Sequence, residues 1–232
     1  MTAEGLDLVA SATDRLMATL RGAVGALGEP SLLPGWTRAH VATHLARNAD
    51  SFTWLLDGAC AAERREQYPG GPATRAAAIE AGATRPDEDV VADVARACAR
   101  FAAACARVPD TTWSATVTAS AGERPASHLV WARLRELEVH HADLGLRYSP
   151  VDWPAPFVDA ELPSRLEGLG SRLPRGTAVR VVRSGTGQAW EVGAGPASVT
   201  VAGTANALLA WLLGRDAPGL EAPAGLPPLA PW

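Results

Sequence analysis

Apolar residues recur every three to four positions along four long stretches of the chain, which is the spacing of one face of a helix. These stretches cover residues 5–27, 38–58, 86–107 and 126–146. Thr37 is placed to cap the second helix, because a threonine hydroxyl accepts a hydrogen bond from the free backbone N–H groups of a first turn. Four such helices, with one long crossover and a central polar cluster, predict a four-helix bundle.

Two segments between these helices lack the helical spacing. Residues 66–86 contain the run Tyr-Pro-Gly-Gly-Pro and are predicted to form a long loop with a short helix at 76–81. Loops of that length are usually functional or disordered. Residues 112–124 are predicted to form a short strand pair or an irregular crossing.

The pattern changes after Tyr148. The proline-rich run SPVDWPAP is predicted to be a linker, and the tail APAGLPPLAPW to be surface coil. The predicted elements between them are a helix at 158–172, strands at 178–183, 188–192 and 198–202, and a last helix at 205–213. The sequence therefore predicts the α+β class, with a bundle over residues 1–150 and a small α+β domain over 151–232.

Composition narrows the classes of partner. The formal net charge is -4 without a concentrated basic patch, so nucleic acid is not an expected partner. No apolar run approaches the roughly 20 residues that cross a bilayer, and the N-terminal residues lack the pattern of a signal peptide. A cytoplasmic protein is expected. All 21 basic residues are arginine, which indicates a GC-rich genome such as that of an actinobacterium.

The three cysteines do not suggest chemistry of their own. Cys60, Cys98 and Cys105 form no CxxC pair, and in a cytoplasmic chain they are expected to be reduced. Cys98 and Cys105 lie seven residues apart and share one helix face, which favours small buried side chains. If thiol chemistry occurs here, an external thiol is expected to supply it.

Metal-competent side chains lie near the inward faces of two bundle helices. His44 points further inward than His40 when the second helix is projected along its axis. On the fourth helix two registers compete. Glu136 and His140 form an i, i+4 pair, whereas Glu138 and His141 have the Glu-x-x-His spacing of di-metal bundles.

Periodicity slightly favours His141 as the buried histidine, and it does not choose between the two pairs. A histidine on a half-apolar face is also often a hydrogen-bonded core residue. Four of the five histidines nevertheless occur as two close pairs. One divalent metal with open coordination positions is therefore a candidate, and it would make the chain a catalyst.

Three segments carry a resemblance to a known family. PGWTRAHVATHLARNAD, YPGGPATRAAAIEAGATRP and RLRELEVHHADLGL resemble the mycothiol-dependent maleylpyruvate isomerases, which are DinB-like metal-dependent thiol enzymes. The similarity extends to LLAWLLGR near the C-terminus. It implies a zinc site at His44, Glu136 and His140, and a catalytic arginine from the C-terminal domain at Arg215.

The resemblance also implies a reaction. The thiolate of mycothiol adds to the cis double bond of maleylpyruvate, the resulting single bond rotates, and loss of the thiolate leaves the trans isomer fumarylpyruvate. This would be a step of gentisate catabolism, with zinc and mycothiol as cofactors. Addition creates an enolate on a dianionic substrate, and arginine suits both charges because its planar fork binds carboxylates bidentately.

Further candidates surround the predicted centre. Arg75 and Arg85 are candidates for binding substrate or thiol, although solvated surface arginines are the ordinary alternative. Asn48 is expected to orient a ligand or to donate a hydrogen bond to the thiol, or else to be a buried amide satisfied by the backbone. Asp143 is expected to hold a ligand histidine from behind, or to pair with an arginine. Arg215 has its own alternative, since an arginine at a helix C-terminus complements the helix dipole.

Two other functions fit the same residues. A mycothiol S-transferase would use the same site and consume the thiol, whereas an isomerase returns it. A non-catalytic bundle would bind metal or a small ligand without turnover. The expected partners are a small-molecule thiol and an electrophilic dicarboxylate, with no nucleic acid or membrane, and the chain is expected to be a monomer or weak dimer.

Overall fold

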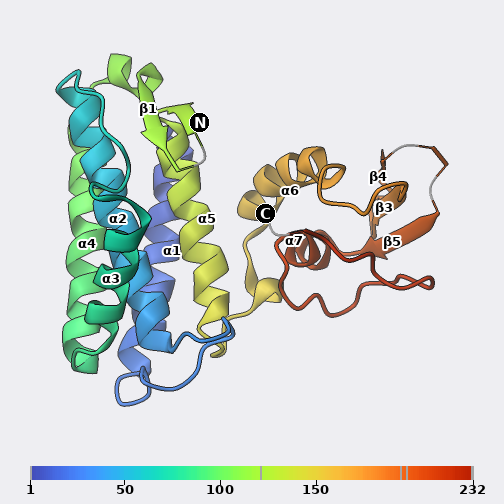
Figure 1. Cartoon of the computed structure of the whole chain (residues 1–232), viewed down its shortest axis with the longest axis horizontal. Helices are drawn as coiled ribbons and strands as arrows, with labels where there is room; N and C mark the ends of the chain where they lie inside the picture. The colour runs from blue at the N-terminus through green and yellow to red at the C-terminus, as the bar shows by residue number, and fades with distance from the viewer. Residues whose placement is uncertain (1, 121, 194, 197, 231–232) are drawn as a thin grey trace. The chain divides into compact units, whose positions relative to one another are not determined.

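The fold was analysed in a computed structural model that describes residues 2–120, 122–193, 195–196 and 198–230. It divides into two compact units, Met1–Tyr148 and Ser149–Trp232 (Figure 1). The first unit is mostly helical, and the second combines helices with a small sheet. The predicted α+β class is confirmed.

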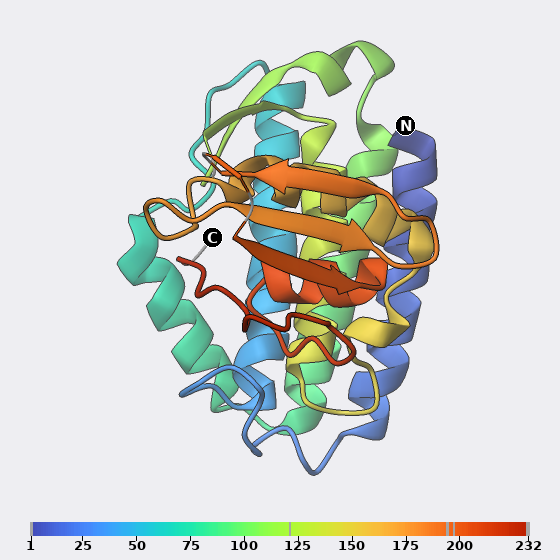
Figure 2. The ribbon, with the colours of Figure 1, turned by 90° about the vertical axis from the view of Figure 1, so that its right-hand side faces the viewer.

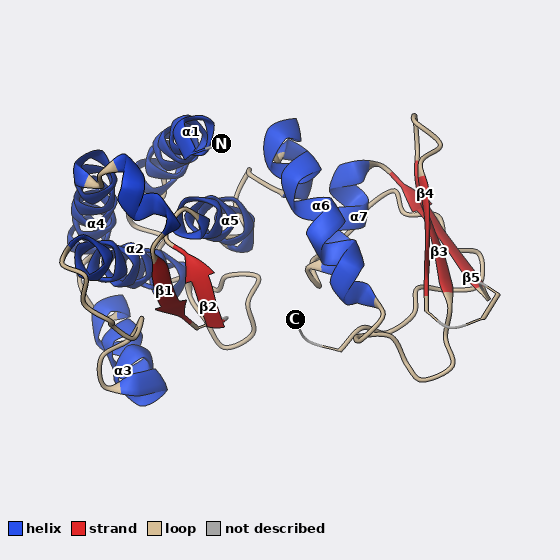
Figure 3. Cartoon of the chain, turned by 90° about the horizontal axis from the view of Figure 1, so that it is seen from above, coloured by secondary structure: helices blue, strands red, loops and turns tan. Residues whose placement is uncertain are grey.

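Four long helices form the bundle of the first unit. They are α1 (Thr2–Gly22), α2 (Arg38–Cys60), α4 (Asp87–Arg107) and α5 (His128–Asp143). Seen end on in Figure 3, α1 lies beside both α4 and α5, and α2 completes the cluster. The predicted helices are confirmed, with ends that move by a few residues. The core between them is filled by small and branched side chains such as Leu16, Leu45 and Leu134.

The start of α2 is held by side chains that the sequence placed there. Thr37 is the N-cap of α2, as predicted, and its hydroxyl accepts a hydrogen bond from the backbone of His40. The connection before it is tied to α4, because Asp87 accepts hydrogen bonds from the backbone N–H groups of Gly25 and Leu27 at 2.7 and 3.0 Å. These contacts fix the start of α2 relative to α4 and to the end of α1.

The segment predicted to be a long loop is largely helical. Helix α3 (Gly71–Ala83) occupies most of it, and extends well beyond the short helix expected at 76–81. Gly70 caps it with a φ of 83°, a conformation that glycine adopts at little cost. The prediction was wrong because α3 buries only Ile79 and Gly82, so it has little apolar periodicity.

Helix α3 packs against α2 by close approach. A Cβ added at Gly82 would lie 2.3 Å from Cγ2 of Thr43, so only glycine allows this spacing. The contact brings Arg75, on the first turns of α3, over the middle of α2. The residues that follow α4 form a 3-10 turn (Asp110–Ser114) and the antiparallel pair β1 (Thr116–Ala119) and β2 (Gly122–Pro125).

The second unit packs two helices against one face of a three-stranded sheet (Figures 2 and 3). Its helices are α6 (Ala155–Leu169) and α7 (Ala205–Leu212), and its strands are β3 (Val179–Arg183), β4 (Ala189–Val192) and β5 (Val199–Gly203). The strand order is β4-β3-β5, with β3 antiparallel to β4 and parallel to β5. The predicted strands and the hairpin between the first two are confirmed.

The proline-rich segment at 149–156, which was predicted to be a linker, is packed onto the second unit. Trp153 is only 3% exposed and packs edge-to-face on Phe157 of α6. The side chain of Asn206 on α7 donates hydrogen bonds to the carbonyls of Pro150 and Trp153. A buried tryptophan therefore attaches the segment to the second unit.

From residue 223 to 230 the tail has no helix or strand, and its last two residues lie outside the described part. Cys98 and Cys105 are buried and Cys60 is exposed, all as free thiols. No helix among the described residues is both long and apolar enough to cross a bilayer.

Candidate metal centre

Three side chains from α2 and α5 converge in the first unit. His44 lies on α2, while Glu136 and His140 lie one turn apart on α5. One ligand atom from each of the three lies within 4.8 Å of the other two. Nε2 of His44 is 2.9 Å from Oε2 of Glu136, and Nε2 of His140 is 3.5 Å from the same oxygen. Two imidazole nitrogens and one carboxylate oxygen therefore face a common point.

His140 is oriented from behind by Asp143. Nδ1 of His140 lies 2.8 Å from Oδ2 of Asp143, whose side chain is 1% exposed. A carboxylate there accepts the Nδ1 proton, and so keeps the Nε2 lone pair directed toward Glu136 and His44. This arrangement, a ligand histidine backed by a carboxylate, is common in zinc sites.

His44 has a different second contact. Nη2 of Arg75 lies 2.9 Å from Nδ1 of His44. A guanidinium only donates hydrogen bonds, so Nδ1 is the acceptor and the neutral ring carries its proton on Nε2, toward Glu136. Trp36, just before α2, packs against the same imidazole with ring centroids 5.8 Å apart. Trp36 was not among the residues predicted from the sequence, although it belongs to the PGW run before the helix.

Burial and neighbouring charges set the protonation of the pair. Burial lowers the pKa of His44 to about 4, although the hydrogen bond with Glu136 opposes this shift. Burial opposes ionisation of Glu136, but the hydrogen bond and charge of His44, with the charges of His140 and Arg133, lower its pKa to about 2. At neutral pH the centre therefore offers a neutral imidazole beside a carboxylate, which are the protonation states that bind metal.

These shifts predict how the stability of the metal-free protein depends on pH. At His44 the unfolded chain, with the ordinary pKa of 6.5, binds more protons than the folded chain between pH 6.5 and about 4. Folding stability should therefore fall as the pH drops through that window, by about 3 kcal/mol from this group. Urea unfolding at several pH values should show a smaller fall for His44→Asn. Equal falls in both proteins would contradict the shift.

The competing pair on α5 has other partners. The carboxylate of Glu138 is buried and contacts Nη2 of Arg15, at 2.5 Å, and the hydroxyl of Tyr148. Nε2 of His141 lies 2.8 Å from the hydroxyl of Thr19, and its ring stacks on Tyr148. Both residues face α1 and do not join His44. Periodicity had favoured His141 as the buried histidine, and it is the more buried of the two.

Asn48 lies one turn after His44 and is buried. Its side-chain oxygen accepts a hydrogen bond from Nη1 of Arg133, at 2.8 Å. The same Nη1 donates to the backbone carbonyl of Leu45, also at 2.8 Å. In the structure Asn48 is thus a buried amide whose oxygen connects α2 to Arg133 on α5.

The three predicted arginines lie in different surroundings. Arg75 contacts the centre through His44, as described. Arg85 pairs instead with Asp93 at 2.7 Å, and Asp93 also binds Arg47. Arg215 belongs to the second unit, where it follows α7 and its Nη1 donates to the carbonyl of Leu213 at 2.6 Å.

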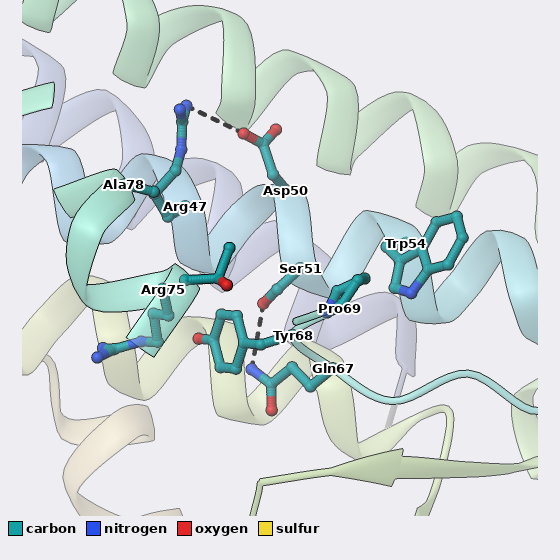
Figure 4. Close-up of a pocket in the computed structure, with 10 residues that line it drawn as sticks. Arg47, Asp50, Ser51, Trp54, Gln67, Tyr68, Pro69, Arg75 and Ala78 are labelled. Atoms are coloured by element: carbon teal, nitrogen blue, oxygen red, sulfur yellow. Dashed lines mark hydrogen bonds and ion pairs between the residues drawn. The ribbon is translucent and has the colours of Figure 1, made fainter. Parts of the chain in front are cut away.

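A pocket of about 310 Å³ adjoins Arg75 (Figure 4). Tyr68, Trp54 and Arg47 contribute to its walls, and the side-chain amide of Gln67 donates to the hydroxyl of Ser51 at its edge. The guanidinium of Arg75 lies 5.3 Å from the centre of the Tyr68 ring. Arg75 therefore connects the pocket with the metal-competent residues.

Comparisons with known proteins identify the family and the fold. Residues 6–145 match the family of the mycothiol maleylpyruvate isomerase N-terminal domain. Two solved structures are similar, those of a mycothiol-dependent maleylpyruvate isomerase and of a histidine-to-alanine mutant of such an enzyme. Each is 25% identical, covers 100% of this chain and 97% of its own, and has a TM-score of 0.92.

No relative is found among curated proteins. The family match spans more than half of the chain and includes all three metal-competent residues. The predicted resemblance is confirmed. The chain belongs to the mycothiol maleylpyruvate isomerase N-terminal domain family.

Proposed function

We propose that this chain catalyses the zinc- and mycothiol-dependent isomerisation of maleylpyruvate to fumarylpyruvate. The observation that carries the proposal is the convergence of His44, Glu136 and His140, in a chain whose fold matches a mycothiol-dependent isomerase over its whole length. Three protein ligands are the number that catalytic zinc sites use, and they would leave room for an external ligand.

The residues fit zinc. Two histidine nitrogens and one carboxylate are a common catalytic donor set for this metal, and Asp143 supplies the carboxylate behind His140. When bound, zinc would supply acidity to a coordinated thiol, so that the external thiol reacts as the thiolate at neutral pH. The chain would hold the metal with His44, Glu136 and His140.

Arg75 is proposed to change partner when the metal is present. If Nε2 of His44 is a ligand, a neutral ring carries its proton on Nδ1, where it faces the Arg75 guanidinium. Two donors cannot form that hydrogen bond, so Arg75 would be released from His44. The released guanidinium, beside the pocket of Figure 4, would bind a carboxylate of the substrate.

Arg75→Met should therefore raise zinc affinity and weaken substrate binding. The variant removes both a competing hydrogen bond to His44 and a nearby positive charge. A hydrogen bond of about 1 kcal/mol corresponds to roughly fivefold tighter zinc binding. Competition with a chromophoric chelator measures this change, and steady-state kinetics should show a raised KM. Arg64→Met, on an exposed arginine that pairs with Glu123, is the control, and equal zinc affinity in both variants would refute the release of Arg75.

Arg215 is proposed to stabilise the enolate that forms when the thiolate adds to the double bond of the substrate. Its guanidinium would oppose the negative charge that develops on the substrate oxygens, and such charge stabilisation is a large part of catalysis in acyl and enolate chemistry. Because it acts on the substrate, its loss should leave metal binding intact.

One assay tests the function. Zinc-loaded protein is incubated with maleylpyruvate, with and without mycothiol, while fumarylpyruvate and free thiol are followed. Thiol-dependent formation of fumarylpyruvate with no net loss of thiol is expected. Stoichiometric consumption of the thiol would instead assign an S-transferase, and tight zinc binding without turnover would refute an enzymatic role with this substrate.

A further inference from the structure

A second cavity lies on another side of the bundle, between α1 and α4. Its volume is about 460 Å³, which is within the range of sites for small molecules. Val9 and Met17 of α1 and Phe101 and Ala102 of α4 line its walls. We call it the α1–α4 groove. None of the three metal-competent residues lines it.

One residue of α5 reaches the groove, and that residue is charged. Arg133 is only 1% exposed, yet its hydrogen-bond acceptors are all uncharged. They are the carbonyl of Leu45 and Oδ1 of Asn48, both 2.8 Å from Nη1, and Sγ of Cys98, 3.3 Å from Nη2. Within the described ranges, no carboxylate comes within ion-pair distance of this guanidinium.

Arg133 interacts through charge with Glu136, without a hydrogen bond, but on the groove side its guanidinium is poorly compensated. A buried cation is costly unless an anion and good acceptors surround it. A thiol is a weak acceptor, and it is the partner of Nη2, whereas Nη1 is fully engaged by Leu45 and Asn48. The other charged residues that line the groove, Asp14 and Arg21, are exposed. A carboxylate arriving from the groove would supply a far better acceptor at Nη2.

We propose that the α1–α4 groove is a second ligand site, which binds a small amphiphile with a carboxylate head and an apolar body. The carboxylate pairs with Arg133 in place of the Cys98 sulfur. The apolar body lies along Val9, Met17 and Phe101. This site is separate from the metal centre and does not depend on the reaction proposed there.

The test compares two probes of equal length on the full-length chain. Octanoate and octan-1-ol share the apolar body, but only octanoate carries the charge. Calorimetric titration should show octanoate binding at least tenfold more tightly than octan-1-ol, since a charge-assisted hydrogen bond in a buried site distinguishes them. Arg133→Met should bring the affinity for octanoate down to that for octan-1-ol.

A second variant tests the groove without touching the buried charge. Ala102→Phe places a ring in the groove from α4 and should weaken both probes at least tenfold. Ala103→Phe is the matched control, because Ala103 is exposed on the same helix and does not line the groove. It should bind both probes as the unmodified chain does.

Three outcomes would overturn the proposal. The first is no binding of octanoate, or no preference for it over the alcohol. The second is equal octanoate binding by Ala102→Phe and Ala103→Phe. The third is loss of octanoate binding in His44→Ala, which would place the ligand at the metal centre. Persistence of octanoate binding in His44→Ala supports the groove even if the proposed isomerase activity is not found.

Discussion

Replacing His44 or His140 with alanine is expected to abolish zinc binding and turnover together. Each residue supplies one of the three ligand atoms that lie within 4.8 Å of one another. Two remaining ligands do not retain zinc against dilution, since catalytic sites use three protein ligands. Metal analysis after dialysis should give near-zero zinc per chain, and the rate should fall to that of the reaction with free thiol.

His141 provides the matched control on the same helix. It is adjacent to His140 and more buried, but it contacts Thr19 and Tyr148 on the side of α1. His141→Gln should keep its zinc and most of its activity while losing some stability, because a buried hydrogen bond is changed. Full zinc occupancy in both His44→Ala and His140→Ala would remove the metal centre from these residues.

Arg215→Ala is expected to keep its zinc and lose turnover by about 100-fold or more, the usual effect of removing one group that stabilises a developing oxyanion. Arg215→Lys should recover little of the rate, because lysine keeps the charge but not the planar fork that binds a carboxylate bidentately. Metal analysis and kcat are measured on the same preparations.

The alternative for Arg215 is structural. Its guanidinium donates to the carbonyl of Leu213 near the C-terminus of α7, where a cation complements the helix dipole. Arg172→Ala is the control, because Arg172 donates to the carbonyl of Leu212 at the same helix end. If Arg215→Ala and Arg172→Ala lower stability alike and both turn over at the normal rate, Arg215 has only this structural role.

The bundle could be predicted well because helix periodicity is local. The apolar repeats around Leu16, Leu45 and Leu134 describe one face of each helix without reference to the others. The cap at Thr37 is also local, since the hydroxyl and the amide it accepts from are three residues apart. The strands after residue 178 were recognisable for the same reason, through their residue types and the hairpin turn.

Helix α3 and the segment around Trp153 could not be predicted in this way. Helix α3 buries only Ile79 and Gly82, of which Gly82 packs against Thr43, and one apolar side chain with one glycine makes no apolar repeat. Trp153 is buried against Phe157, and Asn206 of α7 donates to its carbonyl, which its proline-rich neighbours gave no sign of. Both depend on what a distant part of the chain presents to the segment.

The metal-competent centre shows most clearly which features follow from local sequence and which from tertiary packing. The sequence by itself determined that α2 carries an inward histidine and that α5 carries two adjacent histidines. Glu136 lies one turn before His140, and Glu138 lies three residues before His141. Periodicity could not choose between Glu136 with His140 and Glu138 with His141. It measures direction about a single helix axis, and both histidines lie close to the core side of α5.

Only the tertiary structure decided which pair meets His44. Helix α5 lies between α2 and α1, so its core side faces two neighbours at once. Glu136 and His140 point toward α2, whereas Glu138 and His141 point toward Arg15 and Thr19 of α1. A metal site requires side chains from different helices to converge on one point, and that convergence is set by how the helices pack.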